Sequence, residues 1–206
     1  MTLYSTSSTW TTQEHHLFSD SVRKFYQDEM VPNVEKWNEK GIVDKEFWLK
    51  AGEAGIMGGS VPEQYGGSGG DMGFDSVALY EQARAGDGSW GYGIQSIVIH
   101  YVSAYGSDEQ KTKWLPKLIS GEKIGALAMT EPGAGSDVQS IKTSAQRDGN
   151  QYTINGSKIF ITNGQSADLV IVTSKTNKNE GAKGVSLIMV DTSEVDGFRR
   201  GKNLKK

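Results

Sequence analysis

The hydrophobic pattern of the chain changes its period near residue 120. Up to Ser120, apolar residues recur at the three- and four-residue spacing of amphipathic helices. We expect helices over about residues 12–30, 45–54, 73–85, 94–105 and 107–118. Pro32 should stop the first helix, and Pro116 should kink the last one or shift its start, because proline has no N–H to donate. Ser107 and Gln110 have the spacing of a capping box at the start of the last helix.

From Gly121 onward the pattern predicts strands and tight turns. Short apolar runs alternate with the dipeptides Asp148-Gly149, Asn155-Gly156 and Asn163-Gly164, which are typical of hairpin turns. We expect strands over residues 124–127, 142–147, 152–154, 158–162, 169–174 and 185–191. Because no helix separates them, they favour an antiparallel barrel or sandwich. The predicted fold class is α+β, with an N-terminal helical domain at residues 1–122 followed by a β-domain at residues 123–206.

Composition narrows the classes of protein. The 206 residues suffice for one large domain or two small ones, and the net charge of −3 comes with no basic stripe. Nucleic acid and anionic membranes are therefore not expected as partners. The absence of cysteine excludes disulfides, thiolate catalysis and cysteine-ligated metals, and three scattered histidines do not suggest a metal site. The first residues show neither a signal peptide nor an arginine-rich transit pattern, so we expect a cytoplasmic location.

Candidate chemistry is concentrated in residues 128–137, directly after a predicted buried strand. Gly133 and Gly135 should let the backbone approach a ligand closely and adopt positive φ. Successive N–H groups in such a turn can bind an anion. Thr130 and Ser136 each add a hydroxyl that donates and accepts. The segment therefore suits a large planar polar ligand with a phosphate tail.

Residues of this segment, and other candidates along the chain, also have purely structural interpretations. Thr130 and Thr162 are ordinary strand residues when taken alone, Phe160 fits a core position, and Lys183 fits a solvated charge. The two glycines could simply form a turn. Glu131 has no evident acid–base partner. The glycine-rich stretch at residues 62–71 lacks the ending of a P-loop and is expected to be a flexible loop between helices.

Two motifs together resemble one known family. Residues 130–137, Thr-Glu-Pro-Gly-Ala-Gly-Ser-Asp, and residues 155–164, Asn-Gly-Ser-Lys-Ile-Phe-Ile-Thr-Asn-Gly, are similar to those of the acyl-CoA dehydrogenases. The order of a helical half followed by a β-domain also agrees, and the resemblance covers the chain from about Thr12 to its end. Met129 and Phe160 are most like the long-chain members of the family.

The resemblance implies FAD as cofactor, held between a helical domain and the β-domain. Thr130 would bond the pyrimidine edge of the flavin and Thr162 would bond near N5, while Phe160 would abut the ring. Ser136 would reach the pyrophosphate and the acyl-CoA substrate, and Lys183 would contact the CoA moiety. The residues implied for the cofactor are Leu127, Ala128, Met129, Thr130, Glu131, Pro132, Gly133, Ala134, Gly135, Ser136, Phe160, Ile161 and Thr162.

The implied activity is that of an oxidoreductase of fatty acid metabolism, a flavoprotein that converts acyl-CoA thioesters to trans-2-enoyl-CoA. Its partners would be an electron-transfer flavoprotein and, in a homotetramer, copies of itself. In the family the catalytic glutamate lies in a C-terminal helical bundle, so no residue present takes the role of base. Two hypotheses remain: part of such an enzyme, or a non-catalytic flavin- or acyl-CoA-binding module that is itself the natural product. Without the bundle, the helices at 94–105 and 107–118 and one face of the β-domain should expose apolar surface and cause association.

Overall fold

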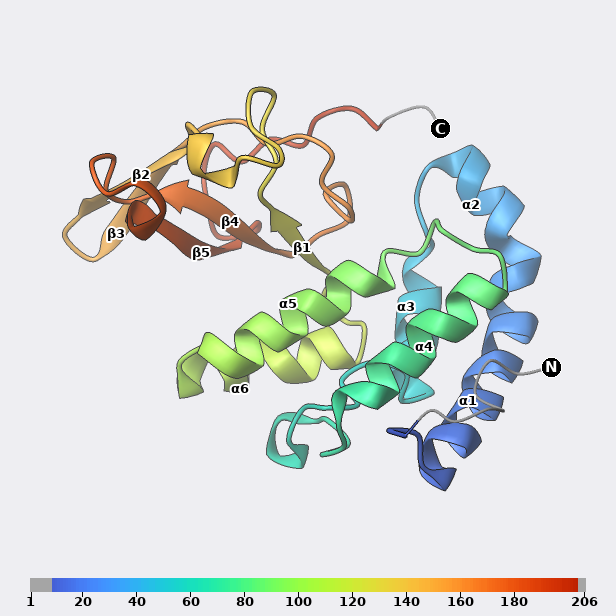
Figure 1. The fold of residues 1–206 in the computed structure, drawn as a ribbon. Helices are drawn as coiled ribbons and strands as arrows, with labels where there is room; N and C mark the ends of the chain where they lie inside the picture. The colour runs from blue at the N-terminus through green and yellow to red at the C-terminus, as the bar shows by residue number, and fades with distance from the viewer. Residues whose placement is uncertain (1–8, 204–206) are drawn as a thin grey trace. The chain divides into compact units, whose positions relative to one another are not determined.

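The computed structural model describes residues 9–203, which form two compact units (Figure 1). The helical unit runs to Lys123, and the β-unit runs from Ile124 to Lys202. The organisation as a helical part followed by a sheet is confirmed.

The helical unit contains six α-helices within the described residues. They are α1 (Gln13–Phe25), α2 (Val34–Lys40), α3 (Lys45–Glu53), α4 (Met72–Arg84), α5 (Tyr92–Tyr105) and α6 (Asp108–Ile119). The capping box of α6 is confirmed, since Ser107 Oγ accepts from Gln110 N at 3.2 Å and Gln110 Oε1 accepts from Ser107 N at 2.9 Å. α6 starts directly after this cap and runs through Pro116, so Pro116 does not shift its start.

Pro32 does not stop the helical course of the chain. After α1 the backbone widens into a π-helical turn, Tyr26–Met30, and tightens into a 3₁₀ turn, Val31–Asn33, before α2 begins. Pro32 lies in the first turn of that 3₁₀ segment, where its missing N–H leaves no hydrogen bond unmade. The helix expected over residues 12–30 corresponds to α1 and the π-helical turn, which end at Met30, but α2 beyond Pro32 was missed. α2 ends at Gly41, whose φ of 72° suits glycine and whose N–H bonds Trp37 O at 2.8 Å.

Large aromatic side chains fill the interior of the helical unit. Trp37, Trp48, Tyr26 and Tyr92 are almost completely buried. Trp90 packs against Trp48 and Tyr92 with ring centroids 5.4 and 5.0 Å apart, within the range of favourable aromatic pairs. The helical pattern of the sequence thus corresponds to one apolar core.

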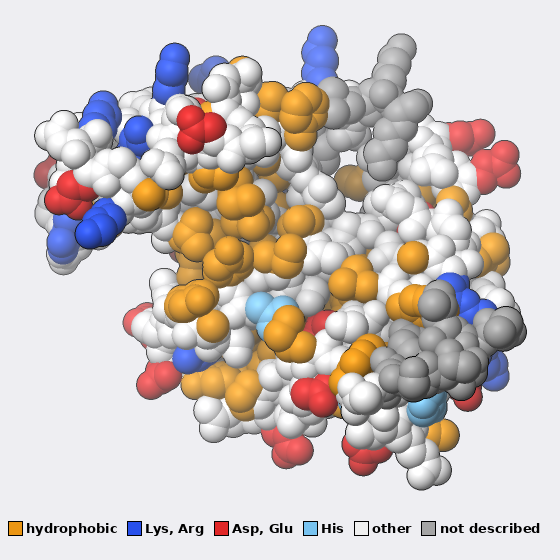
Figure 2. Space-filling model, in the orientation of Figure 1, with side chains coloured by type: hydrophobic (Ala, Val, Ile, Leu, Met, Phe, Trp, Pro, Cys, Tyr) orange, Lys and Arg blue, Asp and Glu red, His pale blue; other side chains and the backbone are white. Residues whose placement is uncertain are grey.

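The β-unit is built on one sheet. Its strands are β1 (Gly125–Ala128), β2 (Ser144–Asp148), β3 (Gln151–Asn155), β4 (Leu169–Lys175) and β5 (Val185–Asp191). The order is β1-β4-β2-β3, and β5 also pairs with β4. Figure 2 shows hydrophobic side chains gathered over β4 and β5, with lysines and arginines toward the outer end of this unit.

The sheet is mixed, which corrects the expectation of purely antiparallel strands. β2 pairs antiparallel with β3 and β4 with β5, but β1 runs parallel to β4 in the register Gly125↔Leu169 to Ala128↔Val172. β2 also meets β4 in parallel at Ser144↔Lys175. Turn dipeptides predict only pairings between neighbouring strands. The β1–β4 pairing joins residues more than forty apart, and parallel strands need such a long crossover connection.

The strand predicted at residues 158–162 does not form. Phe160 has φ 56° and Asn163 has φ 65°, and a residue with positive φ cannot continue a pleated strand. Ile159 N–H instead donates to Thr130 O at 2.9 Å. The β-propensity of Ile159, Ile161 and Thr162 is overridden by this tertiary contact.

Candidate functional site

The structure brings the two sequence motifs together at the end of β1. Lys158 Nζ donates to Met129 O and to Glu131 Oε1, both at 2.9 Å. Together with the Ile159–Thr130 backbone bond, these contacts join segment 129–131 to segment 158–159. Asn163 Nδ2 donates to Gly125 O at 3.0 Å, so the second segment is also attached to the start of β1. Residues 125–136 and 158–163 therefore form one continuous structure, called the joined loops below.

Glu131 anchors this structure from inside. It is 7% exposed, and its carboxylate accepts from Lys142 N at 2.6 Å and Thr143 N at 2.9 Å in addition to Lys158. Burial by itself would raise the pKa of Glu131, but these hydrogen bonds favour the carboxylate and lower its pKa to about 2. A carboxylate with so low a pKa is a poor general base near neutral pH. Its role in the joined loops is structural.

In the turn after Thr130, the backbone is uncovered at two glycines, Gly133 and Gly135. Glu131 N donates to Ala134 O at 2.8 Å and Ala134 N donates to Glu131 O at 3.1 Å, which closes the turn over Pro132 and Gly133. Neither Gly133 nor Gly135 has a positive φ, so the expected left-handed conformation was wrong. A Cβ at either glycine would meet no atom within 4 Å. The backbone at both glycines is therefore open to close approach by another molecule.

The joined loops also carry three residues with hydroxyl groups. Thr130 is half-buried, and Ser136 and Thr162 are exposed. Within residues 9–203, none of these three hydroxyls bonds another protein group. Each can donate one hydrogen bond and accept others. The three hydroxyls could therefore hydrogen-bond to the polar edge of a bound ring or to a phosphate.

Phe160 is presented to solvent in a strained conformation. Its side chain is 68% exposed, which excludes a core position, and its φ of 56° is costly for a residue with a bulky side chain. Such a residue costs roughly 1–2 kcal/mol and persists only where neighbouring contacts hold it. The contacts of Lys158 and Ile159 directly before it, and of Gly164 N with Ile161 O at 2.9 Å after it, hold the segment here.

The joined loops therefore fit the flavin implied by the sequence. Gly133 and Gly135 leave room at the backbone, Thr130 and Thr162 offer donors, and Phe160 offers an apolar surface. These groups match a flat ring with a hydrogen-bonding edge and a phosphate tail.

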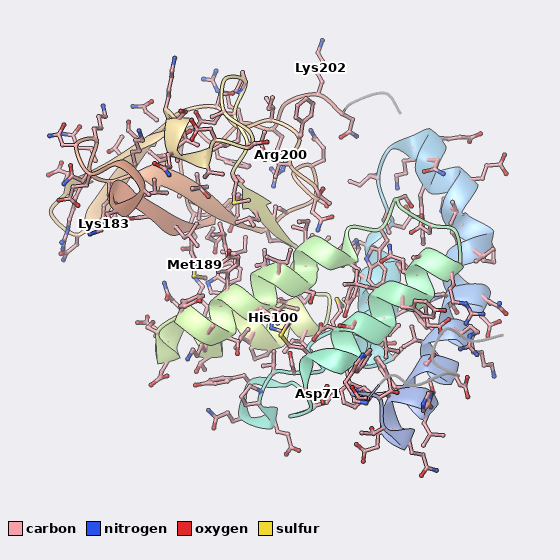
Figure 3. The ribbon with its side chains drawn as sticks, in the orientation of Figure 1. Asp71, His100, Lys183, Met189, Arg200 and Lys202 are labelled. Atoms are coloured by element: carbon pink, nitrogen blue, oxygen red, sulfur yellow. The ribbon has the colours of Figure 1, made fainter. Side chains whose placement is uncertain are left out.

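Lys183 is not part of the joined loops. It lies in the 3₁₀ turn Gly181–Gly184 between β4 and β5, and its backbone N donates to Glu180 O at 3.0 Å. This turn follows the end of β4 at Lys175, which pairs with β2, whereas β1 pairs with the other end of β4. Figure 3 shows Lys183 at the outer end of the β-unit, away from β1.

Sequence reasoning missed two residues that organise the loops, Lys158 and Asn163. Lys158 contacts Glu131 across 27 positions, and Asn163 contacts Gly125 across 38 positions. No local spacing pattern marks such pairs. Glu131 was judged to have no partner, although a lysine inside the second motif could have suggested one.

The helical unit holds a separate polar cluster around Asp75. Asp75 Oδ1 accepts from Tyr92 Oη at 3.0 Å and Ser96 Oγ at 2.9 Å, and His100 Nε2 lies 3.4 Å from Oδ2 (His100 is labelled in Figure 3). Burial acts to raise the pKa of Asp75, but these partners outweigh it and lower the pKa. Asp75 in turn raises the pKa of His100. Within residues 9–203, no group of three His, Asp or Glu side chains could hold a metal ion, and no helix is long and apolar enough to span a membrane.

Family models match both units. The model described as "Acyl-CoA dehydrogenase, N-terminal domain" matches residues 12–122, and the one described as "Acyl-CoA dehydrogenase, middle domain" matches residues 126–206.

Individual proteins are similar over nearly the whole chain. The mitochondrial long-chain specific acyl-CoA dehydrogenase of Rattus norvegicus is 45% identical over 196 residues, which cover 94% of this chain and 45% of that protein. The crystal structure of an acyl-CoA dehydrogenase from Geobacillus kaustophilus is 42% identical with a TM-score of 0.92, covering 97% of this chain and 53% of that one. A glutaryl-CoA dehydrogenase from Mycobacterium smegmatis in complex with FADH2 is 31% identical with a TM-score of 0.81, covering 92% and 48%. The chain thus spans about half the length of these relatives.

These relatives correct the expected location. The rat long-chain enzyme and an isovaleryl-CoA dehydrogenase of Pongo abelii are both mitochondrial. The expectation of a cytoplasmic protein is therefore contradicted by the location of these curated relatives. That expectation relied only on the pattern of the first residues, which says less than the relationship of nearly the whole chain.

Proposed function

Since the chain belongs to the acyl-CoA dehydrogenase family, we propose that it forms the flavin- and substrate-binding part of an enzyme that dehydrogenates acyl-CoA thioesters. The observation that carries the proposal is the pair of joined loops. Their bare glycines, unpaired hydroxyls and strained, exposed Phe160 belong to two motifs that Lys158 and Glu131, 27 positions apart, join. A loop with only a structural task would not need an aromatic side chain held outward at positive φ.

FAD would supply the redox chemistry, accepting the hydride removed from the β-carbon of the acyl chain. The proposed task of this chain is to bind and orient the cofactor. Thr162 would donate a hydrogen bond near the ring nitrogen that gains electron density, and Thr130 would donate to the pyrimidine edge. Ser136 would bind phosphate or substrate, and Phe160 would shield the ring from water. Lys183, at the outer end of the β-unit, is proposed to contact the CoA moiety.

The base that removes the α-proton is proposed to lie outside these 206 residues. Glu131, with its pKa near 2 and its three hydrogen-bond donors, is not a suitable candidate. In the whole enzyme, electrons would pass on to an electron-transfer flavoprotein, and the assembly would be a homotetramer. Family membership alone supports these two partners.

The test is a titration of FAD into the 206-residue chain, followed by quenching of flavin fluorescence. We expect saturable binding. Gly135→Val should weaken it at least about tenfold, since its side chain would fill the space at the backbone and cost more than about 1.4 kcal/mol of binding free energy. Gly201→Val is the matched control, because its Cβ also meets open space but lies outside the joined loops.

Two outcomes would contradict the proposal. The first is a chain that is purified without flavin absorbance and binds no FAD when FAD is added. The second is binding that Gly135→Val and Gly201→Val weaken equally. Far-UV circular dichroism of all three proteins checks that each is folded.

A further inference from the structure

We propose that Lys158 and Glu131 are positioning residues that set the conformation of the joined loops for the cofactor. Neither residue would need to touch the flavin. The identity of the ligand rests on the proposed function, whereas the geometry rests on contacts within the β-unit alone.

Lys158 holds one peptide group of the first loop from inside. Its side chain is only 10% exposed, and its ammonium donates to Met129 O and Glu131 Oε1, each at 2.9 Å. A buried ammonium needs such partners, because an unpaired charge in the interior is strongly unfavourable. Both acceptors belong to the segment that leads into the glycine turn. Lys158 thus ties the second motif to that segment by a side chain.

Glu131 fixes the other end of this connection. Its carboxylate accepts from Lys142 N and Thr143 N, the two residues that directly precede β2 at Ser144. The ammonium of Lys158 therefore bonds to a carboxylate that the entry to β2 already holds in place. Hydrogen bonds between charged groups are shorter and stronger than neutral ones, so this connection is well suited to define position.

These contacts orient the peptide groups on both sides of Thr130. A trans peptide is planar, so a Met129 carbonyl held toward Lys158 directs the Thr130 N–H to the opposite side. On the other side of Thr130, its carbonyl accepts from Ile159 N at 2.9 Å. Both peptide groups that flank Thr130 are therefore oriented by the second motif.

Phe160 follows directly after these contacts. Its positive φ is unfavourable and must be imposed by the residues around it. Because Lys158 and Ile159 are bonded to the first motif, the backbone directly before Phe160 is held in one orientation. The same pair thus orients the hydroxyl residue of one loop and the aromatic residue of the other.

A simpler interpretation is that the pair only stabilises the β-unit. The two interpretations differ in one respect. A purely stabilising pair would affect cofactor affinity only through the folded fraction, so every variant that folds would bind FAD as the wild type does. A positioning pair would leave affinity low in the folded double variant, since the bond to Met129 O is still missing.

The experiment compares Lys158→Met, the double variant Lys158→Met with Glu131→Gln, and Lys178→Met. Lys178 is the matched control, an exposed lysine in the loop between β4 and β5. NMR amide exchange of the FAD-free chain reports on Ile159, with Ile171 in β4 as reference for the fold. Quenching of flavin fluorescence gives the dissociation constant of FAD for each folded variant.

We expect faster exchange of the Ile159 amide in Lys158→Met and in the double variant, with Ile171 unchanged. FAD should bind both variants about tenfold or more weakly, the effect of losing one charge-assisted hydrogen bond. Lys178→Met should match the wild type in both measurements. If Lys158→Met does not fold, the double variant decides.

Unchanged Ile159 exchange, or wild-type affinity in the double variant, would overturn the proposal. If the wild-type chain binds no FAD, the proposed function fails. The exchange of Ile159 then still decides whether Lys158 positions the loop.

Discussion

At the scale of single residues, Phe160 shows what the joined loops impose. It is exposed, and its φ of 56° belongs to the region that favours glycine. Nothing in the residue itself favours this conformation, so the contacts on either side of it must maintain it. Glu131 shows the same dependence, since its low pKa results from donors at Lys142, Thr143 and Lys158 that lie 11 to 27 positions away in sequence.

The strain at Phe160 can be measured. We predict that Phe160→Gly is more stable than Phe160→Ala by about 1 kcal/mol, because only glycine adopts positive φ without a Cβ penalty. The free energy of unfolding is obtained from urea titrations of the two variants followed by NMR signals of β4. Tryptophan fluorescence would not serve, since all five tryptophans precede the β-unit.

The same pair of substitutions at Tyr152 is the control. Tyr152 is also exposed but lies in β3 with ordinary φ, so alanine should be the more stable replacement there. Equal or greater stability of Phe160→Ala over Phe160→Gly would show that Phe160 is not strained.

At the scale of elements, local signals predicted most helices and the hairpin strands. The capping box at Ser107 and the turn at Gly149, with φ 58°, each depend on residues a few positions apart. The errors occur where an element depends on distant contacts. α2 forms beyond Pro32, and residues 158–162 leave the strand conformation because Ile159 bonds Thr130.

One packing contact between elements is equally hidden from local pattern. Gly52 lies near the end of α3, and a Cβ there would overlap the backbone of Ser120 after α6. We predict that Gly52→Ala destabilises the helical unit by about 1–3 kcal/mol despite the higher helix propensity of alanine. Denaturant titrations followed by tryptophan fluorescence measure this, because Trp48 lies on the same helix.

Gly88→Ala is the control for Gly52→Ala. A Cβ at Gly88 meets no atom within 4 Å, and its φ is not left-handed, so its stability should stay within about 0.5 kcal/mol of the wild type. If Gly52→Ala were as stable as Gly88→Ala, the close approach of α3 to Ser120 would be wrong.

At the scale of the whole molecule, the chain consists of two compact units, each with its own core. Exposed apolar surface was expected on both of the last two helices, and the structure corrects half of this. On α6, Trp114, Leu115 and Leu118 are buried. On α5, Ile97 is 39% and Tyr105 80% exposed. Burial on α6 reflects its packing against α5, where Gln95 Nε2 also donates to Leu118 O at 2.8 Å.

We therefore predict that the 206-residue chain self-associates as its concentration rises, through apolar surface that includes α5. Sedimentation velocity should show weaker association for Ile97→Gln combined with Tyr105→Gln. Leu17→Gln on α1 is the control, since Leu17 is 62% exposed but lies on another helix. A wild-type chain that stays monomeric at high concentration would contradict the prediction.

Family membership, the division into a helical part and a sheet, and most element positions could be predicted from the order of residues alone. These depend on periodicity, caps, turn dipeptides and two motifs, all of which act over short stretches of chain. The sequence also identified Thr130, Ser136, Phe160 and Thr162 as candidates for the site, through resemblance.

How these parts meet could not be predicted from the sequence and depends on the folded structure. The parallel pairing of β1 with β4, the loss of the strand at 158–162, and the Lys158–Glu131 contact all join distant residues. Their free energies come from burial and from hydrogen bonds that exist only once the chain has folded. The order of residues along the chain specifies which groups are available, and folding decides which of them become neighbours.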